Sequence, residues 1–166
     1  MKKSIVTKAL IVLGVFLFIG NISVAQQFKY IGAMKCKMCH NKPDKGAQYD
    51  TWLAGPHANA MKSLKGEDAE NPECLRCHST YHVIDKSLRM SIKADEGVSC
   101  EACHGPGSMY KSMSIMKDRE KAIAKGLLVP TEEMCRKCHN EESPDFKGFN
   151  YKEYLAKIAH DDPTTE

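Results

Sequence analysis

Cys36-Lys37-Met38-Cys39-His40 is the first of four Cys-x-x-Cys-His segments in this chain of 166 residues. The other three are Cys74-Leu75-Arg76-Cys77-His78, Cys100-Glu101-Ala102-Cys103-His104 and Cys135-Arg136-Lys137-Cys138-His139, and the four segments contain all eight cysteines. This spacing is the attachment signature of c-type haem: the two thiols bond to the vinyl groups and the histidine ligates the iron. The sequence therefore predicts four covalently bound haems c.

Two other interpretations of the cysteines are open to a chain of this kind. An exported protein with an even number of cysteines can form disulfides, and pairs of Cys-x-x-Cys can hold structural zinc. Disulfides explain neither the uniform spacing nor the four histidines. A zinc site made of four thiolates would not use the histidine that follows each pair, and the first two pairs are too far apart for a compact zinc ribbon.

The N-terminus has the pattern of a cleaved signal peptide over residues 1–25. Three lysines, Lys2, Lys3 and Lys8, border the apolar stretch from Ala9 to Ile19, which is short for a membrane span. Ser23-Val24-Ala25 has small residues at its first and third positions, so we expect cleavage after Ala25. An uncleaved N-terminal anchor is the alternative. Export predicts a periplasmic protein, in agreement with haem attachment outside the bacterial inner membrane.

The formal charge changes when the signal peptide is removed. The whole chain has 24 basic and 21 acidic side chains, and the segment carries three of the lysines and no acid. The mature chain then has 21 of each, and the haem propionates make the holoprotein acidic. This balance excludes a nucleic-acid partner and allows contact with a membrane only by transient docking.

Residues 26–166 are expected to form a single tetrahaem domain, since 141 residues are few for a side-chain core around four macrocycles. We predict a mainly α fold with much irregular structure and few or no strands, built around stacked haems. The expected helices cover residues 48–53, 58–64 and 108–125. Others begin after Asn71, Thr131 and Asn150. Residues 161–166 are expected to form a loose tail.

Seven histidines are available for eight axial positions. His40, His78, His104 and His139 are the proximal ligands, which leaves His57, His82 and His160 for the distal sides. Three irons would then have two histidines, and the fourth would have a methionine, a partner molecule, water or nothing. Each spare histidine also has a simpler explanation, such as helix capping for His57 or a surface position at a helix end for His160.

The chain resembles the tetrahaem cytochromes of the cytochrome c-554 type. Besides the four motifs, the resemblance is carried by Tyr30-Ile31-Gly32-Ala33, by the segment from Trp52 to Ala58, and by the run from Gly97 to Ser108. It implies stacked haem pairs, first with third and second with fourth, and a five-coordinate iron at the second motif. It also implies that His57 serves the third haem, His82 the first and His160 the fourth. Related proteins often carry a histidine shortly after Gly105-Pro106-Gly107-Ser108, where this chain has Tyr110.

The function expected from these features is electron transfer. The partners would be a periplasmic oxidoreductase and a membrane quinol-linked or terminal electron-transfer protein. One alternative is a redox enzyme that binds a small nitrogen oxide or a hydroxylamine-type ligand at the open haem. Another is a subunit of a multihaem conduit in which a neighbour supplies the missing ligand. The sequence contains no obvious acid–base pair in a substrate pocket, which favours the electron carrier.

Overall fold

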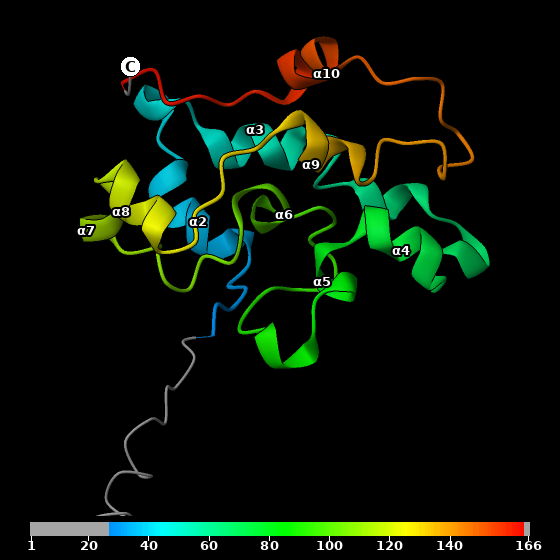
Figure 1. The fold of residues 1–166 in the computed structure, drawn as a ribbon, viewed down its shortest axis with the longest axis horizontal. Helices are drawn as coiled ribbons and strands as arrows, with labels where there is room; N and C mark the ends of the chain where they lie inside the picture. The colour runs from blue at the N-terminus through cyan, green and yellow to red at the C-terminus, as the bar shows by residue number, and fades with distance from the viewer. Residues whose placement is uncertain (1–26, 165–166) are drawn as a thin grey trace, which may run out of the picture.

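The computed structural model describes residues 27–164, so the predicted signal peptide lies outside the described residues. Short helices joined by long irregular segments make up the fold, as the sequence predicts, and the one β-type contact among the described residues is an isolated bridge between Tyr30 and Arg89. Helices α7 and α8 lie at one end of the molecule and α4 at the other, with α6 between them (Figure 1). No helix in the described part is long and apolar enough to cross a membrane.

Each Cys-x-x-Cys-His motif lies on or at the end of a short helix. These helices are α2 (Ala33–His40), α4 (Pro72–His78), α6 (Cys100–His104) and α9 (Glu132–Arg136). Asn71 caps α4 by accepting a hydrogen bond from the backbone N–H of Glu73, and Thr131 caps α9 by accepting one from Met134. Both N-terminal caps were predicted from the sequence and are confirmed.

The remaining elements connect the motif helices. The other α-helices are α3 (Gln48–Ala54), α5 (Thr80–Val83), α7 (Met113–Met116), α8 (Arg119–Ala124) and α10 (Tyr151–Ile158). The 3-10 helices are η1 (Pro43–Lys45), η2 (Ala60–Ser63), η3 (Gly66–Ala69) and η4 (Lys86–Leu88). The predictions for α3 and for a helix after Asn150 are confirmed.

Two helix predictions were wrong in extent. The segment 58–64 forms only the 3-10 turn η2, because the Asn59 amide donates to the carbonyls of Leu53 and Gly55 and closes the end of α3. The segment 108–125 is divided into α7 and α8. Asp118 interrupts it by accepting a hydrogen bond from the Lys121 N–H, which starts a new helix at Arg119.

The C-terminal segment is anchored through Thr164, contrary to the prediction of a loose tail. Lys45 in η1 donates to the Thr164 hydroxyl at 2.7 Å and pairs with Asp162 at 3.7 Å. The carbonyl of Asp161 passes so close to Gly46 that there is no room for a Cβ at that glycine. The chain after α10 therefore returns to η1 and Gly46, just after the first motif, as the red segment at the top of Figure 1 shows.

The protein part of the core is small. Seven apolar residues are buried among those described, whereas twelve large apolar residues are exposed, among them Met34, Met38 and Leu53. A water-soluble chain of this length normally buries a larger share of its apolar side chains. The polypeptide alone therefore does not supply a complete apolar interior.

Candidate haem-binding site

The eight cysteines are all free thiols in the structure, so none takes part in a disulfide. The described residues also contain no group of three or more histidine, cysteine or acidic side chains arranged to hold a metal ion. Within residues 27–164 the Cys-x-x-Cys pairs are therefore neither joined by disulfides nor gathered with a third such ligand into a metal site. Each pair instead remains available to react, with its histidine at the end of the same short segment.

The thiols of different motifs meet in pairs. The thiols of Cys36 and Cys100 lie close enough to interact, and this interaction lowers the pKa of Cys36 and raises that of Cys100. Cys77 and Cys138 form the second such contact, and burial together with Cys77 raises the pKa of Cys138 to about 12. The first motif therefore lies against the third and the second against the fourth, which is the pairing that the resemblance implies for the haems.

Two pairs of histidine rings lie across from each other. The ring centres of His57 and His139 are 6.1 Å apart, and those of His104 and His160 are also 6.1 Å apart. A metal ion bound by two imidazoles needs about 2 Å to each nitrogen, and each nitrogen is about 1 Å from its ring centre, which totals roughly 6 Å. Both pairs therefore have the separation that a shared iron requires.

Burial lowers the pKa of His57, His104 and His139 and so favours their neutral form, which is the form that binds a metal. Loss of solvent is the largest cause of the lowered pKa of His57, His104, His139 and His40. For His57 the neighbouring His139 lowers the pKa further, and His160 does the same for His104. Phe149 stacks on His139 with ring centres 4.9 Å apart and holds its plane.

Hydrogen bonds to Nδ1 orient two of the histidines. Nδ1 of His160 is 2.7 Å from the carbonyl oxygen of Ile158, and Nδ1 of His78 is 2.9 Å from that of Ala60. In both residues Nε2 is then the nitrogen left for an iron. Next to the His40 ring lies Gln48, whose Oε1 is buried without a well-formed hydrogen bond. That unpaired oxygen is suited to accept a hydrogen bond from the ring N–H of a ligating His40.

His57 is placed by the segment that precedes the third motif. Its carbonyl accepts a hydrogen bond from the N–H of Val98 at 2.9 Å, and the Trp52 indole donates to the carbonyl of Val98 at 2.9 Å. Gly97 has a φ of +63°, and a Cβ there would be 2.5 Å from the His57 carbonyl oxygen. Only a glycine allows the two segments to approach this closely.

Glu101, inside the third motif, connects that motif to the chain leading into the first. Its carboxylate is 2% exposed and accepts hydrogen bonds from the backbone N–H groups of Ile31, Gly32 and Gly107 at 2.6 to 3.0 Å. Burial raises the pKa of Glu101, and these donors act in the opposite direction. The side chain fixes the start of α2 relative to α6 and so holds the first and third motifs together.

His82 stands apart from both ring pairs. It lies on α5 and is exposed, its Nδ1 is 2.8 Å from the Ser79 hydroxyl, and its ring packs edge-on against Tyr81 at 5.2 Å. Within residues 27–164 its ring meets none of the four motif histidines. The structure therefore brings His57 and His160 to proximal histidines but does not bring His82 to one.

The ring contacts of His57 and His160 differ from the haem assignments that the resemblance implies. His57 was expected to serve the third haem and lies against His139 of the fourth motif, whereas His160 was expected at the fourth and lies against His104 of the third. The contacts of Lys45 with Asp162 and Thr164 hold the segment that follows His160 near the end of the first motif.

The residues present fit haem c. Free thiol pairs with an adjacent histidine, imidazole pairs at metal-binding separation and the orphaned Gln48 Oε1 are suited to attachment, ligation and orientation. The exposed apolar side chains supply surfaces for the porphyrins to cover. Sequence reasoning missed Glu101 and Gln48 as supporting residues. Glu101 lies within the run from Gly97 to Ser108 that carried the resemblance, whereas no sequence signal marks Gln48.

Comparisons with known proteins confirm the resemblance to the cytochrome c-554 family. Residues 35–105 match the family described as cytochrome c554 and c-prime. Cytochrome c-554 of Nitrosomonas europaea is 27% identical over 180 residues, which cover 88% of this chain and 73% of that protein. The solved structure of the reduced state of cytochrome c554 from Nitrosomonas europaea aligns with a TM-score of 0.53 and 26% identity, covering 81% of this chain and 79% of the other.

Proposed function

Because this chain is related to the cytochromes c-554, we propose that it is a periplasmic electron-transfer protein with four covalently bound haems c. The relatives support the coarser part of this statement, a multihaem c-type cytochrome that transfers electrons. The number of haems, their ligands and the compartment are our proposals. They rest on the four motifs and on the geometry of the described residues.

The observation that carries the proposal is the pairing of the motifs. The contacts between Cys36 and Cys100 and between Cys77 and Cys138 bring four attachment sites into two adjacent pairs. Cys103 and Cys135 are also near enough for the second thiol to raise the pKa of the first, which connects the third motif with the fourth. Sites this close allow electrons to move along the whole series. When bound, the haems supply the one-electron chemistry.

The residues of this chain hold and orient that series. His57 with His139 and His104 with His160 lie at the separation of two imidazoles that share one iron, and they would hold two of the haems. Ala60 and Ile158 fix the tautomers of His78 and His160 through their carbonyl oxygens. Two imidazoles favour low potentials relative to a methionine and histidine pair, as is suited to an electron carrier near the reducing end of a chain.

The proposed partners are redox proteins. We propose a periplasmic oxidoreductase on one side and a membrane quinol-linked or terminal electron-transfer protein on the other, with only transient docking at the membrane. Support comes from the export pattern of residues 1–25 and from the balanced charge of residues 26–166.

A redox enzyme is the second candidate, and His78 is the residue that favours it. Its Nδ1 is held by the Ala60 carbonyl and lies 3.1 Å from the Ser63 hydroxyl. No other histidine ring lies against it within the described part of the chain. An iron there would have an exchangeable position for a small nitrogen oxide or hydroxylamine-type ligand. In a conduit, a neighbouring subunit would fill that position instead.

The proposal is tested by expressing the full chain together with a bacterial haem-maturation system. We expect a periplasmic protein that begins at Gln26, four haems per chain by the pyridine haemochrome assay, and no loss of haem in acid acetone. The double variant Cys74→Ser, Cys77→Ser should retain three. Reduction by dithionite followed by stoichiometric reoxidation with a c-type acceptor would support electron transfer. Fewer than four covalent haems in the unaltered protein would contradict the proposal.

A further inference from the structure

We infer that the chain supplies an axial histidine pair to only two of its haems, so that the irons of the first and second motifs both have an exchangeable sixth position. This inference rests on the proposed function in requiring four attached haems. It departs from the sequence prediction of three irons with two histidines each. The additional open site is the one served by His40.

Two of the three spare histidines lie against motif histidines. His57 and His160 lie against His139 and His104 at the same ring separation of 6.1 Å. Each has a motif histidine from a distant part of the chain as its partner. The third and fourth motifs therefore use two of the three spare histidines.

The third spare histidine is held on its own helix. Nδ1 of His82 contacts the hydroxyl of Ser79, a residue that is 2% exposed and lies at the start of α5. Tyr81 packs against the His82 ring, and Arg89 lies over the Tyr81 ring at 4.1 Å. The Arg89 guanidinium in turn donates to the carbonyl of Ile84. The contact with Ser79 engages Nδ1 and leaves Nε2 of His82 open, but the ring lies exposed on α5 and faces no motif histidine among residues 27–164.

The surroundings of His40 contain no further imidazole for its iron. The groups that influence its ring are Gln48, Asp162 and His160, and His160 is already paired with His104. Methionine sulfur is the other common ligand. The sulfur of Met34, which lies on the same helix as His40, accepts the Tyr49 hydroxyl at 3.7 Å. Because Met34 and His40 share α2, that sulfur is poorly placed to bind from the opposite face.

Tyr110 follows the third motif closely, just after residues 105–108. It is buried, and its hydroxyl donates to the carbonyls of His104 and Gly105 at 3.0 and 2.8 Å. The phenol is thus used to close the turn after the third motif. Tyr110 itself therefore offers no imidazole to the first haem, in agreement with an open position there.

The ligand class for both sites is a small neutral diatomic molecule, and carbon monoxide is the probe. The ferric holoprotein should show two bis-histidine irons by electron paramagnetic resonance and near-infrared magnetic circular dichroism. The dithionite-reduced protein should bind two equivalents of carbon monoxide. His82→Ala should leave both numbers unchanged. His57→Ala and His160→Ala should each lower the bis-histidine count to one and raise carbon monoxide binding to three.

Three bis-histidine irons, one equivalent of carbon monoxide, or a loss of one bis-histidine signal in His82→Ala would overturn the inference. The unaltered protein and the exposed His82 variant decide the matter even if the variants of buried histidines fail to fold. Failure of the proposed function is distinguishable, because it would appear as fewer than four haems in the pyridine haemochrome assay before any ligand is added.

Discussion

Replacement of Gly97 by alanine tests whether close backbone packing positions His57. Gly97 has a φ of +63°, and a Cβ there would lie 2.5 Å from the carbonyl oxygen of His57 and 2.7 Å from that of Ala58. Both atoms belong to the backbone, so no flexible side chain can move aside. The segment that carries His57 must shift, and the hydrogen bond from the Val98 N–H to the His57 carbonyl is lost or lengthened.

The magnitude follows from two contributions. A left-handed conformation costs an alanine about 1 kcal/mol relative to glycine. The displaced carbonyl and its hydrogen bond add about 1–3 kcal/mol. Gly66→Ala is the matched control, since Gly66 has a φ of +54° and nothing lies within 4 Å of its Cβ position. Gly66→Ala should therefore cost only the first of these two amounts of unfolding free energy, that of the left-handed backbone.

The assay combines guanidinium unfolding of the holoprotein, followed by haem absorption, with the count of bis-histidine irons. We expect Gly97→Ala to lose about 2–4 kcal/mol of unfolding free energy and to convert the fourth-motif iron from low to high spin. Gly66→Ala should lose about 1 kcal/mol and keep its spectrum. Equal stability losses in the two variants, with both spectra unchanged, would refute the reasoning.

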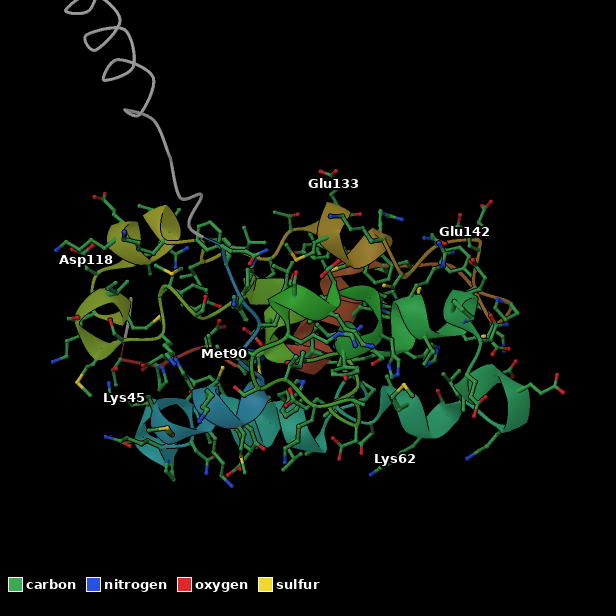
Figure 2. The ribbon with its side chains drawn as sticks, turned by 90° about the horizontal axis from the view of Figure 1, so that it is seen from below. Lys45, Lys62, Met90, Asp118, Glu133 and Glu142 are labelled. Atoms are coloured by element: carbon green, nitrogen blue, oxygen red, sulfur yellow. The ribbon has the colours of Figure 1, made fainter. Side chains whose placement is uncertain are left out.

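Three further substitutions test the supports of the site. Glu101→Gln replaces one of two buried acceptor oxygens with an amide donor that faces N–H groups, so it should cost about 2–4 kcal/mol by denaturant unfolding. Its control is Glu133→Gln on α9, whose exposed side chain points away from the body of the molecule (Figure 2) and whose variant should change stability by under about 0.5 kcal/mol. Tyr110→Phe leaves two carbonyls without their donor and should cost about 1–2 kcal/mol, and a melting temperature equal to that of the unaltered protein would contradict this. Thr131→Ala removes the cap of α9 and should cost about 1 kcal/mol in the same assay, whereas Thr131→Ser should restore it.

Local signals predicted local structure well. The caps at Asn71 and Thr131 and the helix after Asn150 depend on side chains that bond to backbone groups two or three residues away, so they can be read along the chain. The prediction of one long helix over 108–125 failed for a related reason. Asp118 lies inside that segment, and the hydrogen bond that it accepts from the Lys121 N–H starts a new helix.

The sequence by itself determined the chemistry: eight cysteines and seven histidines specify four attachment sites and too few imidazoles for eight axial positions. Only the tertiary structure decided which histidine faces which. His57 and His139, like His104 and His160, come from distant segments, and no local pattern relates them. Their meeting depends on Gly97 passing close to His57 and on the C-terminal segment binding Lys45. Those contacts are set by how the whole chain packs, because the free energy that selects them comes from residues far apart in the sequence.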